Sequence, residues 1–324
     1  MRFAGEPMDE LFRVPSALGG ERIDRALALL TGLSRSEVNM LLDAGKVSIA
    51  GRTVKVRSRK VREGEHVGVE GAMVDLRGSA ALKPEPRVEV PVVWSDDDVI
   101  VVDKPAGLVV HPGAGTRAGT LVQGLLARYP DLAGAGGEED RPGIVHRLDK
   151  GTSGLLVVAR RPVAFASLSA QMAARTVGRE YLALLAGQVE ADEGLIDAPL
   201  GRSHVDPTKI RVQAGGRQAR TEYKVVERFS EPSPSTLVSC RLQTGRTHQI
   251  RVHFASIGHP VVGDERYGSR KLGNWEPLPY GRPFLHAAKL QFEHPTTCEA
   301  VTFRSELPAD LSSVLGGISQ RRPG

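Results

Sequence analysis

The chain has 324 residues, of which 40% are hydrophobic and 25% are charged, a composition typical of a globular protein of about two domains. It excludes collagen-like and wholly disordered chains. The net charge of +5 is compatible with a polyanionic partner. Two cysteines, Cys240 and Cys298, are too few for a zinc site or a disulfide framework and favour a cytoplasmic protein. No apolar run approaches the roughly 20 residues that cross a bilayer, so we expect no membrane segment.

Two short helices are predicted near the N-terminus. Residues 22–31 carry apolar side chains at spacings of four and three, which places them on one stripe of a helix. Ser34 and Glu37 match a capping box at the start of a second helix, and Gly45 is well placed to end it. The sequence therefore predicts a helix pair.

A basic segment follows the helix pair. Between Lys46 and Arg62 there are seven basic residues and no acidic one. Alternation of valine with polar residues predicts short strands, which would place Lys55, Arg57 and Arg59 on one face. Such a stripe could follow a row of phosphates, although most runs of this kind are only solvated surface.

The stretches RIDRAL, GLSRSEV and LLDAGKVSIAG carry a family resemblance. Together they resemble the small RNA-binding domain of the S-four type, which would span residues 12–73 after a tail of residues 1–11. In that family the helices and the following turn contact RNA. The resemblance therefore implies RNA contacts by Arg35, Ser36 and Lys46.

A segment with little periodicity and two prolines, residues 74–87, is expected to link this domain to a larger one. The larger domain would span residues 88–316, with a tail of residues 317–324. Its strand-like runs and irregular helical insertions follow no regular βαβ pattern, so we expect an α+β fold with a mixed, mostly antiparallel sheet flanked by helices. Strands are predicted over 99–103, 154–159, 181–186 and 237–242, one helix from Pro162, and another helix capped by Thr247.

The densest polar cluster lies in GIVHRLDKGTSGLLVVAR, residues 143–160. Asp149 stands between Arg147 and Lys150, whose positive charges favour an ionised carboxylate that could act as nucleophile or base. From spacing alone, an aspartate in a structural turn is an equally open reading. A hydrolase that uses Asp149 with His146 is a further alternative.

A second cluster lies in RLQTGRTHQIRVHF, around the predicted start of the Thr247-capped helix. Arg246, His248 and Arg251 stand there, where free backbone N–H groups and the helix dipole favour an anion or a buried carboxylate. His248 and Arg251 share one face of that helix. His248 and His253 would diverge by about 140° at their spacing of five residues, so we predict no metal site.

These two segments, with DKPAGLVVHPG before them and REYLALLAG between them, resemble the RluA-type pseudouridine synthases over residues 90–305. The resemblance implies isomerisation of uridine to pseudouridine in RNA, with Asp149 as the essential aspartate. Attack on the ribose, attack on the uracil ring and a glycal intermediate are all discussed for the family. No cofactor is implied, because the reaction is redox-neutral. An S-four-type domain in front is typical of enzymes that modify large-subunit (23S) ribosomal RNA or its assembly precursors.

The same resemblance implies roles for further residues. Tyr181 and Leu242 could also be simple core residues. The rival function is a catalytically silent RNA-binding or ribosome-assembly factor, and in either case we expect a monomer. The implied roles are pairing with the aspartate for Arg251, packing on the target base and proton transfer for Tyr181, displacement of the flipped nucleotide for Arg147, an apolar wall for Leu242, and phosphate or base-edge binding for Arg246 and His248.

Overall fold

The computed structural model divides the chain into two compact units, Met1–Ala81 and Leu82–Gly324, and each is described by itself. No described helix is long and apolar enough to cross a membrane. The described residues are 10–31, 33, 35–70, 82–113, 116–138, 140–203, 206, 209–268, 278–279 and 281–319.

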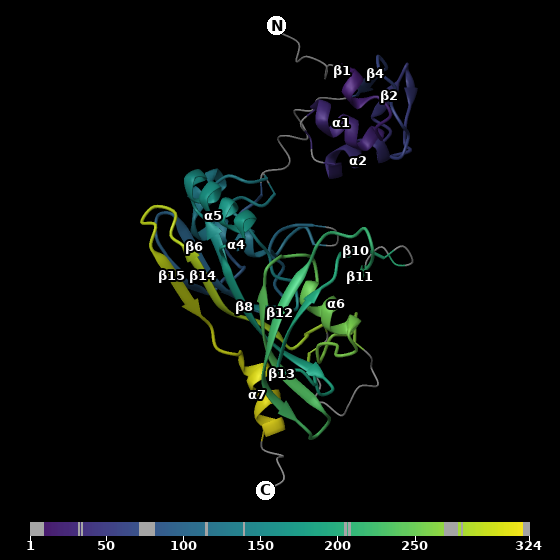
Figure 1. The fold of residues 1–324 in the computed structure, drawn as a ribbon. Helices are drawn as coiled ribbons and strands as arrows, with labels where there is room; N and C mark the ends of the chain where they lie inside the picture. The colour runs from purple at the N-terminus through teal and green to yellow at the C-terminus, as the bar shows by residue number, and fades with distance from the viewer. Residues whose placement is uncertain are drawn as a thin grey trace. The chain divides into compact units, whose positions relative to one another are not determined.

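The N-terminal unit packs the predicted helix pair against a four-stranded antiparallel sheet of order β1-β4-β2-β3 (Figure 1). Apolar side chains of both helices, including the fully buried Ile23, Leu27 and Leu42, form one core with the sheet. The proposed cap residue Ser34 lies outside the described residues. The elements are β1 (Glu10–Arg13), η1 (Ser16–Leu18), α1 (Ile23–Thr31), α2 (Arg35–Asp43), β2 (Val47–Ile49), β3 (Arg52–Thr53) and β4 (His66–Val69).

The predicted strand through the basic segment is wrong beyond Thr53, where β3 ends. β3 is an edge strand, and after one more backbone bond, from Val54 N–H to the Val47 carbonyl (2.8 Å), the chain turns away. Alternating residues no longer share a face once the strand has ended, and Val56 is 63% exposed. Lys55, Arg57 and Arg59 therefore do not form the expected stripe.

The larger unit confirms the predicted α+β architecture with a mixed, mostly antiparallel sheet. Nine strands pair in the order β5-β6-β7-β14-β8-β13-β12-β9, with β15 added to β14, and β7 runs parallel to β14. A separate hairpin joins β10 and β11. The strands are β5 (Val92–Ser95), β6 (Val99–Lys104), β7 (Ser153–Ala159), β8 (Gly178–Ala186), β9 (Glu193–Asp197), β10 (Leu200–Arg202), β11 (Ile210–Val212), β12 (Arg220–Phe229), β13 (Ser235–Leu242), β14 (Leu285–Glu293) and β15 (Ala300–Arg304).

Helices cover both faces of this sheet, which explains the uninterrupted apolar runs of β6 and β7. Val99 and Val101 face one core with α5, whereas Ile100 and Val102 face a second core that includes residues of α4, α6 and α7 (Figure 1). The helices are α4 (Leu121–Arg128), η2 (Pro130–Gly134), α5 (Pro162–Ala174), α6 (Gln249–Ser256) and α7 (Ala309–Ser319).

The cap of α6 differs from the prediction. His248, not Thr247, is the N-cap residue, and it takes a left-handed conformation with φ 57°. Thr247 is exposed. The side-chain carbonyl of Gln249 accepts the N–H of Arg246 at 3.0 Å instead, so a residue inside the helix satisfies the turn that precedes it.

Part of the expected linker is bound to the larger unit. The Glu85 carboxylate accepts hydrogen bonds from Gly119 N–H and Gln123 Nε2, both at 2.9 Å, and Leu82 packs against the core. At the other end, α7 continues to Ser319, three residues beyond the predicted domain end at 316.

Candidate active site

A cavity of about 700 Å³ lies in the larger unit, and the C-terminal part of α5 lines one side of it. Its walls come from the loop before β7, the first residues of β8, the end of β13 and the start of α6. These segments lie up to about a hundred residues apart in the sequence, so the fold brings them together. Seven residues predicted from the sequence line the cavity, namely Arg147, Asp149, Tyr181, Leu242, Arg246, His248 and Arg251.

Asp149 faces two side chains of the α6 start. Its Oδ2 lies 3.3 Å from Arg251 Nη1 and 3.9 Å from His248 Nε2. The three side chains are 16%, 11% and 15% exposed, respectively, so they meet in a partly water-excluded place. The guanidinium holds the carboxylate in a fixed orientation toward the cavity.

Arg251 is itself held by a second carboxylate that the sequence analysis did not single out. Asp264, whose side chain is fully buried, accepts from Arg251 Nε at 2.6 Å and from Nη2 at 2.8 Å. The N–H groups of Arg266 and Tyr267 also donate to Asp264. Burial opposes the charge of Arg251, but its two carboxylate partners outweigh that effect and raise its pKa. The guanidinium is thus a fixed cation aimed at Asp149.

His248 is oriented by Tyr267. The Nδ1 of His248 lies 2.7 Å from the Tyr267 hydroxyl oxygen, which accepts the Ile210 N–H at 3.1 Å. The hydroxyl group thus joins His248 to the backbone of Ile210 and fixes the plane of the ring. Burial lowers the pKa of His248, so the ring is neutral near pH 7. It can donate a hydrogen bond without adding charge.

Tyr181 lies on β8 between β13 and β14, directly opposite Cys240 and Ala287. It is 5% exposed, and its remaining exposed surface faces the cavity. Burial raises the pKa of its phenol, and the Asp149 charge adds to that effect. The phenol therefore remains protonated near neutral pH and offers an aromatic wall on which a base could pack.

Two buried cations behind the cavity hold the loop that carries the aspartate. Lys104 donates from Nζ to three carbonyl oxygens, of which that of Lys150 lies at 3.3 Å, and Arg282 donates from Nη1 to the Gly151 carbonyl at 2.7 Å. Burial lowers the pKa of Lys104 to about 7. Sequence patterns do not reveal either contact, because each joins segments at least 46 residues apart.

The proposed RNA contacts of the N-terminal unit differ in their surroundings. Lys46 and Lys55 are exposed, and no described residue forms an ion pair with either. Arg57 contacts Asp43, and Arg59 forms a two-pronged pair with a glutamate. The side chains of Arg35 and Ser36 lie outside the described part of the chain. The first two lysines are therefore the freest cations of this set.

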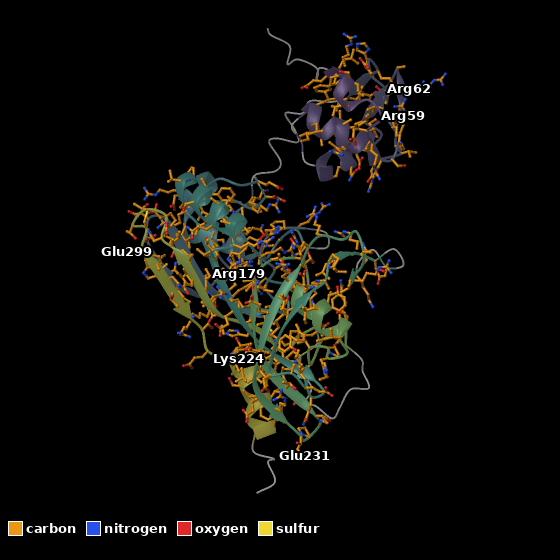
Figure 2. The ribbon with its side chains drawn as sticks, viewed as in Figure 1. Arg59, Arg62, Arg179, Lys224, Glu231 and Glu299 are labelled. Atoms are coloured by element: carbon orange, nitrogen blue, oxygen red, sulfur yellow. The ribbon has the colours of Figure 1, made fainter. Side chains whose placement is uncertain are left out.

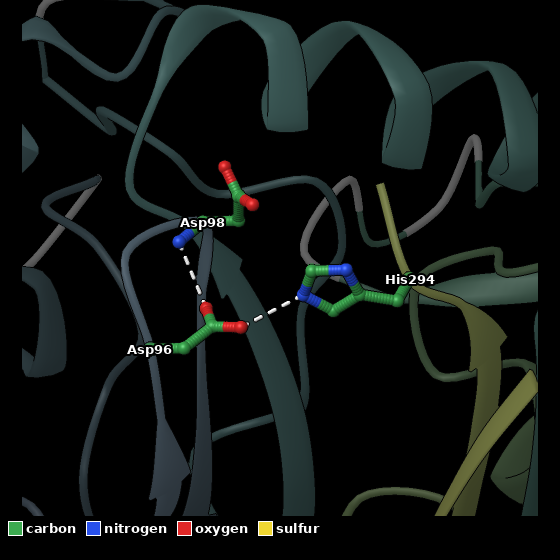
Figure 3. Close-up of side chains that lie close together, drawn as sticks. All are labelled: Asp96, Asp98 and His294. Atoms are coloured by element: carbon green, nitrogen blue, oxygen red, sulfur yellow. Dashed lines mark hydrogen bonds and ion pairs between the residues drawn. The ribbon is translucent and has the colours of Figure 1, made fainter. Parts of the chain in front are cut away.

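Asp96, Asp98 and His294 gather where β5 turns into β6, in a spacing that a metal ion could use (Figure 3). Each ligand atom already has a protein partner. Asp96 accepts two backbone N–H groups and the His294 Nε2 (2.8 Å), and Asp98 binds Arg161 at 2.7 Å and the Thr296 hydroxyl at 2.6 Å. His294 Nδ1 accepts two further N–H groups. This cluster fits a structural network rather than a metal centre.

Comparisons with known proteins identify the family. The family model described as RNA pseudouridylate synthase matches residues 98–256. The uncharacterized RNA pseudouridine synthase YlyB of Bacillus subtilis is 43% identical over 296 residues, which cover 91% of this chain and 93% of that one. Ribosomal large subunit pseudouridine synthase D of Nitrosomonas europaea is 42% identical over 311 residues, covering 94% and 86% of the two chains.

Solved structures give the same answer for the fold. Human RNA pseudouridylate synthase domain containing 1 superposes with a TM-score of 0.55 at 29% sequence identity, over 70% of this chain and 86% of that one. The identity to the bacterial relatives extends over nearly the whole chain. The chain therefore belongs to the RluA-type RNA pseudouridine synthases.

Proposed function

We propose that this enzyme converts specific uridines of large-subunit (23S) ribosomal RNA, or of its assembly precursor, to pseudouridine, with Asp149 as the essential catalytic residue. The observation that carries the proposal is the Asp149 carboxylate, held 3.3 Å from a buried arginine in a cavity that Tyr181 also lines. The target RNA follows from the relatives named as large-subunit ribosomal enzymes. We further propose that the protein acts as a cytoplasmic monomer, in line with its two free cysteines.

The reaction breaks the bond between N1 of uracil and C1′ of ribose, turns the base and joins C5 to C1′. The C5 proton leaves and N1 gains a proton, so atoms and charge balance without a redox partner. Asp149 would serve at the sugar or the base, and Arg251 would orient it. Tyr181 would pack on the uracil, and its phenol would take part in the transfer of the C5 proton.

The substrate has to leave its stack before Asp149 can reach it. Arg147 is exposed at the cavity rim, where it could fill the gap that a flipped uridine leaves. Arg246 is exposed on the same rim, where it could bind a phosphate or a base edge. Leu242, half-buried, would close the cavity with an apolar wall.

The hydrolase alternative is disfavoured by His146. Its Nε2 accepts the Val157 N–H at 3.1 Å, and burial lowers its pKa to about 3. A ring committed to the backbone in this way is a poor base for activating water.

The proposal is tested by mapping pseudouridines in large-subunit ribosomal RNA from cells with and without the protein, and by incubating purified protein with unmodified transcript. We expect one or more sites to depend on the protein. Asp149→Asn should abolish turnover and leave RNA affinity within about threefold, because the amide keeps the shape but cannot act as nucleophile or base. Tight RNA binding by wild-type protein without conversion would support the silent-factor alternative, and release of free uracil would support a hydrolase.

A further inference from the structure

Arg179 is an unpaired cation in the wall of the active-site cavity. It lies two residues before Tyr181 on β8, so both side chains leave the same face of the sheet. Arg179, labelled in Figure 2, is partly buried and lines the same cavity as Asp149. No carboxylate among the described residues pairs with it, and its buried Nε has no hydrogen-bond partner. Most partly buried arginines of this chain are paired, so Arg179 stands out.

A second unpartnered donor belongs to the same wall. The Nε2 of His146 accepts the Val157 N–H, so the neutral ring carries its hydrogen on Nδ1. Nδ1 is buried and has no partner either. The positive charge of Arg179 is near enough to oppose protonation of His146 in addition to burial. Two buried N–H donors of the cavity wall therefore lack an acceptor among the described residues, an arrangement that buried polar groups normally avoid.

Arg179 lies against the loop that precedes α6. A Cβ at position 245 would lie 2.8 Å from Arg179 Nη1, so the tip of the guanidinium is close to the backbone of Gly245. The end of the Arg179 side chain therefore reaches the loop that carries Arg246 and His248.

We infer that the guanidinium of Arg179 binds a phosphate oxygen of the RNA backbone next to the flipped uridine. An unpaired guanidinium favours an anion, and the phosphates are the anionic groups of RNA. Asp149 and Tyr181 line the same cavity and, in the proposed function, contact the sugar and the base of the target uridine. The remaining group within reach of Arg179 is the flanking phosphate. The inference rests on the proposed function for the identity of the substrate.

The test uses full-length protein and a ribosomal RNA hairpin that it binds, prepared as a series in which one phosphate at a time is replaced by an uncharged methylphosphonate. Affinity is measured for wild type, Arg179→Gln and Arg179→Lys. We expect one replacement, next to the converted uridine, to weaken wild-type binding about tenfold and to leave Arg179→Gln binding unchanged. The salt slope of Arg179→Gln should fall by about 0.7, the value for one phosphate contact on a single strand. Arg179→Lys should keep the slope.

Arg241→Gln is the matched control, because Arg241 is an exposed arginine on the adjacent strand β13, opposite Glu180 and outside the cavity lining. It should behave as wild type, and unfolding midpoints should show that all variants are folded. Equal losses in wild type and Arg179→Gln at every phosphate would overturn the inference. The inference would also be overturned if the Arg179→Gln loss of affinity disappeared on replacement of the target base by 2-thiouridine or 4-thiouridine and not on replacement of a phosphate. The guanidinium would then bind a base carbonyl. Binding is read without turnover, so absence of conversion by wild type would count against the proposed function alone.

Discussion

The guanidinium of Arg251 donates hydrogen bonds to two carboxylates, those of Asp264 and Asp149. Asp264 takes its Nε and Nη2 in a fork, and Asp149 receives the remaining Nη1. The fork fixes the plane of the guanidinium, which a single contact to Asp149 at 3.3 Å would leave free to turn. Asp264 is therefore expected to position the Asp149–Arg251 pair without touching substrate.

Asp264→Asn should lower kcat by about tenfold to a hundredfold, because a displaced guanidinium no longer orients Asp149. It should also lower the free energy of unfolding by about 3 kcal/mol, since one partner of a buried ion pair is removed. Steady-state kinetics and urea unfolding measure the two effects. Asp197→Asn removes a carboxylate from the exposed pair with Arg220 and should cost under about 1 kcal/mol. An unchanged kcat in Asp264→Asn would contradict the positioning role.

Lys104 should make stability depend on pH. Its pKa falls from 10.5 to about 7 in the folded protein, so the unfolded chain binds the proton more tightly. Below pH 7 Lys104 is protonated in both the folded and the unfolded chain, and the cost of burying its charge is paid in full. As the pH rises above 7, Lys104 loses its proton in the folded state only, and the free energy of unfolding increases. Wild type should gain about 2 kcal/mol relative to Lys104→Met between pH 7 and 9, as measured by denaturant unfolding. A difference between the two proteins that does not vary with pH would refute the low pKa.

At the scale of elements, the site depends on how closely β7 approaches β14. Gly154, the second residue of β7, has φ +110°, and a Cβ there would lie 2.3 Å from the Ala287 carbonyl oxygen. The parallel pairing of these strands joins His286 to Ser153 and Ala287 to Gly154. The loop that holds Asp149 leads directly into this pairing.

Gly154→Ala should therefore lower the free energy of unfolding by about 3 kcal/mol, through steric overlap and an unfavourable φ together. Thermal and urea unfolding provide the measurement. Gly113→Ala is the control, because nothing lies within 4 Å of a Cβ there and its φ is not in the left-handed range. Equal stability of the two variants would show that β7 and β14 adjust without cost.

At the scale of the whole molecule, the chain holds two units with separate hydrophobic cores. One core contains only residues between Val14 and Val69, and the others contain only residues beyond 81. We infer that the larger unit folds without the smaller one, which would leave RNA affinity as the main contribution of the N-terminal unit.

Deleting residues 1–81 should leave a folded, active enzyme with a raised KM for ribosomal RNA. Lys46 and Lys55 are exposed and form no ion pair with any described residue, so their removal should also flatten the dependence of binding on salt, by about 0.7 to 0.9 in slope for each phosphate that they bind. Circular dichroism, kinetics and binding at several salt concentrations measure these effects. An identical salt slope in the truncated protein would exclude phosphate contacts by the N-terminal unit.

Local pattern revealed the family and most of the elements. Spacings of three and four placed α1 and α5, and continuous apolar runs placed β6, β7 and β8, close to their observed bounds. The strand prediction failed after Thr53, because the alternation of apolar and polar residues continues there but pairing with the neighbouring strand β2 ends. The sequence pattern also misplaced the cap of α6. The observed N-cap, His248, has a left-handed backbone conformation, which its residue type does not predict.

The sequence by itself determined the two-domain outline, the mostly antiparallel α+β fold and the aspartate on which the chemistry is proposed to rest, because motifs and periodicity are local properties of the chain. Only the tertiary structure decided what surrounds that aspartate. Asp264 behind Arg251, Lys104 and Arg282 behind the loop, and the unpaired Arg179 on the cavity wall all come from segments distant along the chain. Ion pairing and burial depend on distances in space, and those distances exist only after the sheet has brought the segments together.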